Sequence, residues 1–113
     1  MEIIRTPIPL AHLEALAAGM FGDLVKAVVD VGQGIMVVGG ELHADEEALL
    51  ITEGSSQRHL WGINLHPDQH GGSDFIEFDS MINIRPSQGN RSRWVDDAAI
   101  RVEIAEIVAR LVE

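Results

Sequence analysis

Residues 25–38, VKAVVDVGQGIMVV, constrain the fold more than any other stretch, because they read as two strands joined by a tight turn. The side chains from 25 to 31 alternate with a two-residue period, which is the period of a strand. Gly32 and Gly34 supply the positive φ angles that tight hairpin turns need. The return strand, residues 35–42, is apolar up to its two glycines, which predicts a central position in a sheet.

Amphipathic helices are predicted toward both ends of the chain. Residues 9–19 place leucine and alanine side chains three and four residues apart, and Gly19 is the expected C-cap. Asp96 or Asp97 begins the last helix, because a carboxylate accepts hydrogen bonds from the free amides of a first turn. The buried stripe of this helix is predicted to be Ile100, Ile104, Ile107, Val108 and Leu111.

Three further strands are predicted at residues 2–5, 61–66 and 75–85. Residues 44–53 are ambiguous, because Asp45 favours a helix whereas the apolar run that follows favours a strand; we expect a strand preceded by a helical turn. Helices at both ends with hairpins between them predict an α+β fold. The sheet is expected to be mostly antiparallel, with four to six strands, an N-terminal and a C-terminal helix on one face, and the other face partly solvated.

The composition fits one domain over residues 1–113, since 46% of the residues are hydrophobic and 23% are charged. The absence of cysteine excludes disulfides, thiolate metal sites and cysteine nucleophiles. No apolar run approaches the ~20 residues that span a bilayer, so we expect a cytoplasmic protein without a membrane partner. The formal net charge of −10 argues against a nucleic-acid partner, because phosphate binding needs a basic surface.

Two of the predicted strands have a polar side. If the strands at 61–66 and 75–85 pair with their apolar sides matched, their polar residues share one surface. Solvated faces are common in antiparallel sheets, but asparagine and aspartate are disfavoured in strands, which favours a binding surface here. The residues that would share this surface are Asn64, His66, Asp79, Asn83 and Arg85.

Residues 85–93, RPSQGNRSR, form a positive island in an acidic chain, because they hold three of its seven arginines and no acid. Arginine forks bind phosphate or carboxylate through paired hydrogen bonds, and the hydroxyls and amides of this segment add further donors. We therefore predict a module that binds an anionic small molecule or protein partner. The predicted ligand-binding residues are Arg85, Ser87, Gln88, Asn90, Arg91 and Arg93 in the loop, with Asn64, Asp79 and Asn83 on the strand face.

Other interpretations of this loop stay open. Its arginines can pair with acids of the same chain, such as Asp96 and Asp97, or dock on an acidic face of a second copy in a structural homo-oligomer. Trp61 and Trp94 offer stacking surfaces for single-stranded nucleic acid, although two tryptophans are thin support in an acidic chain. The loop does not match the phosphate-binding P-loop, and no cofactor is predicted.

Residues 39–47, GGELHADEE, suggest a different class of function. In an extended segment Glu41, His43 and Asp45 point the same way, and histidine with carboxylates is a ligand set for zinc, manganese or iron. Such a site would support a metal-dependent hydrolase, so the question of an enzyme stays open, although no strong signature such as HExxH is present. A fourth ligand would come from His59, His66 or His70.

Three stretches, GGELHADEEALL, LWGINL and FIEFDSMINIRPSQGNRSR, together resemble a family of short prokaryotic proteins, domain of unknown function 5674. The similarity spans nearly the whole chain, and the last stretch is long enough to be specific. The resemblance implies a single-domain, stand-alone intracellular protein, and it assigns no activity and no catalytic residue. The chemistry of the residues therefore remains the guide to function.

Overall fold

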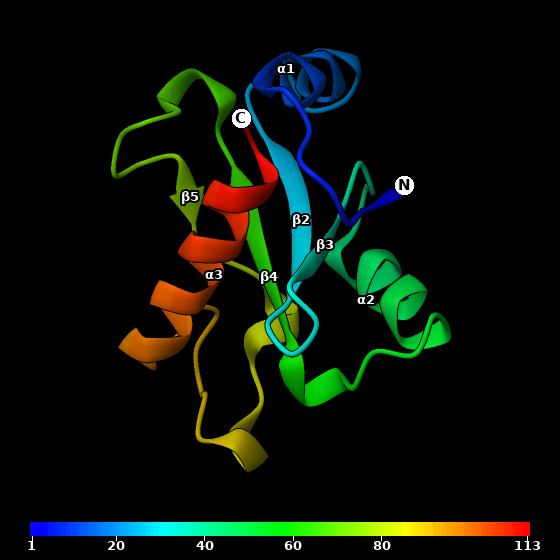
Figure 1. Cartoon of the computed structure of the whole chain (residues 1–113). Coiled ribbons are helices and arrows are strands. Elements are labelled where there is room, and N and C mark those ends of the chain that lie inside the picture. Colours follow the sequence, from blue (N-terminus) through cyan, green and yellow to red (C-terminus); the bar gives the residue numbers. More distant parts are fainter.

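The computed structural model describes residues 1–113 and contains a five-stranded sheet and three α-helices (Figure 1). The strands lie in the order β1-β3-β2-β4-β5, and every neighbouring pair is antiparallel. The predicted hairpin, β2 with β3, therefore lies inside the sheet, and the predicted α+β class is confirmed. The strands are β1 (Glu2–Ile4), β2 (Val25–Asp30), β3 (Ile35–Val38), β4 (Leu60–Leu65) and β5 (Ile76–Glu77).

The helices cover both faces of the sheet. Helices α1 (Leu10–Gly19) and α3 (Ala98–Leu111) pack on one face, as predicted, against a core that includes Ala27 and Ile63. Helix α2 (His43–Thr52) packs on the other face, on the right in Figure 1. None of these helices combines the length and the apolar character needed to cross a membrane.

The predictions for the α2 face were wrong in two respects. The strand expected within residues 44–53 is a helix, and the face expected to be partly solvated is buried beneath it. The physical reason is that Val28 and Val37 point to this face and need an apolar cover, which Leu50 of α2 supplies. Asp45 lies in the first turn of α2, where a carboxylate suits the positive end of the helix dipole.

The prediction of a strand over residues 75–85 was also wrong, because the observed strand is much shorter. Only Ile76 and Glu77 pair with β4, and the chain then leaves the sheet. Ser80 starts a 3₁₀ turn, and its hydroxyl accepts a hydrogen bond from the amide of Ile82 at 3.2 Å. The short 3₁₀ turns of the fold are η1 (Gln57–His59), η2 (Pro67–Gln69), η3 (Met81–Asn83) and η4 (Pro86–Gln88).

Candidate functional site

Asn83 takes the place that the missing part of the strand would have filled. Its side-chain Nδ2 donates to the carbonyl of Gly62 at 3.0 Å, and its Oδ1 accepts from the amide of Gly62 at 2.8 Å. Nδ2 also donates to the carbonyl of Arg93 at 3.0 Å, and the side chain is fully buried. Asn83, predicted to bind a ligand, is therefore bonded within the chain.

Arg85 is likewise engaged by the protein. Its guanidinium donates to the carbonyl of Gln57 at 2.6 Å and to the carbonyl of Leu60, and it lies 4.2 Å from the centre of the Trp61 ring. Burial lowers the pKa of this guanidinium from its ordinary value. Arg85 thus holds the start of the loop against β4, at the edge next to Asn83.

Asn90 and Gln88 hold the rest of the loop together. The Asn90 amide donates to the carbonyls of Asn83 at 2.7 Å and Trp94 at 2.7 Å, and its Oδ1 accepts from the amide of Asp96 at 2.8 Å. The Gln88 amide donates to a carbonyl of the η1 turn at 3.0 Å. These side chains satisfy backbone groups that no strand or helix pairs, which explains why the segment is rich in amides.

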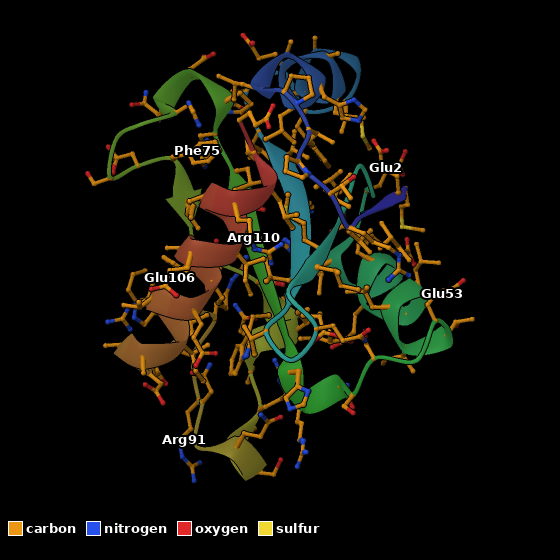
Figure 2. All side chains as sticks on the ribbon, in the orientation of Figure 1. Glu2, Glu53, Phe75, Arg91, Glu106 and Arg110 are labelled. Carbon is orange, nitrogen blue, oxygen red and sulfur yellow. The ribbon has the colours of Figure 1, made fainter.

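Ser87 and Arg91 remain exposed and make no hydrogen bond or ion pair within the chain. Figure 2 shows Arg91 at the tip of the loop, with its side chain pointing away from the body of the molecule. The pocket beside this loop, with a volume of about 350 Å³, is lined by Asp96 and Asp97, whose charges repel an anion. The loop therefore does not gather its arginines around a common cavity.

Three of the predicted residues, Asn64, Asp79 and Arg93, instead line a pocket on the α2 face, which we name the α2 pocket. It lies between the N-terminal turn of α2 and the chain that follows β5, and its volume is about 450 Å³. Its polar lining is Lys26, His43, Asn64, Asp79, Ser80 and Arg93. Its apolar lining is Phe21, Leu24, Leu42, Ala44, Met81 and Ile82.

The two cations of the α2 pocket differ in their pairing. Arg93 binds Asp79 through two contacts, Nε to Oδ1 at 2.6 Å and a terminal nitrogen to Oδ2 at 3.3 Å. Lys26 forms no ion pair, and its ammonium group lies 5.1 Å from the centre of the Phe21 ring. Lys26 is therefore the positive charge that the pocket leaves unneutralised.

His43 adds a neutral ring to the wall of the α2 pocket. Its Nε2 lies 2.8 Å from the carbonyl of Ile63, and because a carbonyl can only accept, Nε2 carries the proton. Burial lowers the pKa of His43, and the charge of Lys26 acts in the same direction. The ring is thus uncharged at neutral pH and keeps an unprotonated Nδ1.

Asn64 contributes an acceptor that the protein leaves unused. Its Nδ2 donates to Oε1 of Glu77 at 2.9 Å and to the carbonyl of Asp79 at 3.3 Å. Its Oδ1 is buried and has no partner in the chain, and the residue is only 7% exposed. A buried acceptor without a partner is costly, so this atom lowers the stability of the fold.

The predicted metal ligands are not brought together. Glu41 precedes α2, and because α2 is a helix, His43 and Asp45 project from different sides of it. His66 lies 3.3 Å from Glu77, in a pair without a third ligand. No group of three histidine, aspartate or glutamate side chains in the chain has a geometry that could hold a metal ion.

Sequence reasoning missed Lys26 and the part that α2 plays in the pocket. The available signal was that Lys26 is the single lysine of the chain and lies in a strand that is otherwise apolar up to Asp30. The apolar wall of the pocket carried no local signal, because its side chains come from segments far apart in the sequence.

Comparisons with known proteins identify the family but no characterised relative. No curated protein and no solved structure matches the chain. A family model with the description Protein of unknown function (DUF5674) matches residues 2–111, in agreement with the resemblance noted in the sequence. The chain therefore belongs to the DUF5674 family.

Proposed function

We propose that the chain binds a small anionic molecule in the α2 pocket. The observation that carries this proposal is Lys26, a cation without an acidic partner in the wall of a pocket, in a chain whose formal net charge is −10. A partly buried charge interacts with a ligand more strongly than a fully solvated charge does, because the surrounding dielectric constant is lower. An anion is the ligand that this arrangement favours.

Two neighbouring features support the same ligand class. The N-terminal turn of α2 borders the pocket at His43 and Ala44, and no side chain caps it, so the first amides of the helix are free to donate to an anion. Arg93 also lines the pocket, and Asp79 holds its guanidinium in place.

Titration of the isotope-labelled protein with inorganic phosphate and with acetate at low ionic strength tests the proposal. The amide resonances of Lys26, Ala44 and Asn64 are expected to shift together and to saturate. Lys26→Met should remove these shifts while the far-UV spectrum and melting temperature stay close to those of the wild type.

The matched control is Arg91→Ala, which removes one positive charge at the exposed loop tip and leaves the α2 pocket intact. This variant is expected to bind as the wild type does. If binding weakens equally in Lys26→Met and Arg91→Ala, the anion responds to net charge alone and the α2 pocket is not its site.

A further inference from the structure

The α2 pocket continues into a second pocket, which we name the Met20 pocket. The Met20 pocket has a volume of about 510 Å³ and lies beside the end of α1. Phe21, Lys26 and Leu42 line both pockets, so the side chain of Lys26 lies where the two pockets meet. The residues found only in the lining of the Met20 pocket are Gly19, Met20 and Glu41.

Exposed apolar side chains concentrate around this double pocket. Met20, Phe21, Leu42 and Met81 are 39%, 43%, 56% and 64% exposed, and they are four of the nine large hydrophobic residues that the chain exposes. They come from three separate segments, namely the end of α1, the link into α2 and the chain after β5. The fold therefore assembles this apolar rim, and an exposed apolar patch beside a polar site is typical of a ligand-binding surface.

We propose that the ligand is an amphipathic anion, with a carboxylate or phosphate head group at Lys26 and an acyl or aryl body along Met20, Phe21 and Leu42. This inference rests on the proposed function and specifies the ligand of the same site. Glu41 lines the Met20 pocket and repels an anionic group there, so the head group is directed into the α2 pocket, where Arg93 is also found. The apolar body then occupies the Met20 pocket.

A homologous series of ligands tests this inference with the full chain. Acetate, butanoate, hexanoate and octanoate, each below its micellar concentration, should bind with affinity that rises about three- to fourfold per methylene, as burial of apolar surface predicts. Octyl phosphate should likewise bind more tightly than inorganic phosphate, and its comparison with octanoate decides which head group is preferred. Octanol, which has the chain without the charge, should bind at least tenfold more weakly than octanoate.

Two variants separate the head group from the body. Met20→Ala, which changes the lining of the Met20 pocket and not that of the α2 pocket, should flatten the dependence on chain length and leave the binding of acetate unchanged. Lys26→Met should weaken the binding of every anion and leave the binding of octanol unchanged. Amide shifts of Lys26, Leu42 and Asn64 locate the bound ligand.

The possible outcomes distinguish this inference from the proposed function. If acetate and octanoate bind equally well at the α2 pocket, the amphipathic ligand is overturned and the anion site stands. If octanol binds as tightly as octanoate, the charged head group contributes nothing to binding and the amphipathic anion is overturned. If no anion shifts these resonances, the anion site itself is overturned. Shifts that appear only elsewhere on the surface overturn both.

Discussion

The side-chain amide of Asn83 pairs with both backbone groups of Gly62, as a neighbouring strand would have done. Asn83→Ala removes these bonds and leaves a buried amide and a buried carbonyl without partners. We expect the free energy of unfolding to fall by about 2–4 kcal/mol, because each unpaired buried group costs about 1–3 kcal/mol. Chemical denaturation measures the loss, and hydrogen exchange should show reduced protection of the Gly62 amide.

Ser87→Ala is the matched control for Asn83→Ala, because Ser87 is exposed in the same segment and makes no hydrogen bond. The free energy of unfolding of Ser87→Ala should stay within about 0.5 kcal/mol of that of the wild type. An Asn83→Ala variant as stable as this control would contradict the role assigned to the amide.

Gly62 must be a glycine because the chain after β5 crosses it closely. A Cβ at this position would lie 2.5 Å from Cβ and 2.6 Å from Oγ of Ser80, which is itself buried. Gly62→Ala should therefore destabilise the fold by about 1–3 kcal/mol. Gly19→Ala, where no atom lies within 4 Å of the added Cβ, should be tolerated.

A double-mutant cycle with Ser80→Gly identifies the cause of that loss. The combination of Gly62→Ala with Ser80→Gly should be more stable than the sum of the two single losses predicts, because the contacts of the added Cβ with Ser80 are removed. Additive losses would show that the contact with Ser80 is not responsible.

Arg85 and Arg91 lie six residues apart in the positive island and should behave differently. Arg85 donates to two backbone carbonyls and stacks on Trp61, so Arg85→Ala should lower the free energy of unfolding by about 2–3 kcal/mol. Arg91→Ala changes the net charge equally but breaks no contact, and it should be neutral within about 0.5 kcal/mol. If the two variants lower the melting temperature equally, the charge of these arginines, and not their contacts, determines their effect on stability.

Glu46 makes the stability depend on pH. Burial raises the pKa of its carboxyl to about 9, so the folded protein keeps a proton that the unfolded chain loses above its ordinary value of 4.5. Ionisation therefore favours the unfolded chain, and this group lowers the stability as the pH rises from 4.5 toward 9.

Glu46→Gln removes this dependence while it keeps the shape of the protonated carboxyl. The gain in the free energy of unfolding of the variant over the wild type should be near zero at pH 4.5. It should grow by up to about 1.4 kcal/mol per pH unit toward pH 8. Urea denaturation at three pH values measures the slope, and parallel curves for the two proteins would refute the raised pKa.

Asp79 should oppose the binding of an anion to the α2 pocket. Asp79→Asn removes a negative charge from the lining and releases the guanidinium of Arg93. Phosphate should therefore bind roughly fivefold more tightly at low salt, because one charge interaction is worth about 1 kcal/mol. The stability should change little, because the ion pair is exposed. Asp68→Asn, which makes the same change of charge at an exposed position outside the pocket lining, is the control in the same calorimetric titration. If the two variants bind phosphate equally, the effect is not local to the pocket.

The parts of the fold that sequence predicted are those whose signal is local. The alternation and glycines of the β2–β3 hairpin and the apolar stripe of α3 each fall within one short window. Helix α2 was missed because the apolar run LLIT looks similar in a helix and in a strand over so few residues. The deciding signal lay elsewhere, in Val28 and Val37, whose side chains show that the second face of the sheet also needs an apolar cover.

The candidate site was harder to predict than the fold, for a chemical reason. The asparagines and arginines of residues 83–93 have the donors that an anion site needs, but the same donors satisfy backbone carbonyls, and composition does not say which partner they take. Lys26, Asn64 and Arg93 are brought together by strand pairing and by the path of the chain after β5. Their proximity therefore depends on tertiary structure and leaves no pattern in any one segment.

The side chains that seal β4 also affect how copies of this protein meet. Past the end of β5, the backbone groups of Gly62 and the carbonyl of Leu60 are already occupied by Asn83 and Arg85. A strand of another molecule that approaches this part of β4 finds no free backbone donors or acceptors with which to pair. Edge-to-edge aggregation is therefore blocked there, although no charged or proline-rich edge strand covers this part of β4.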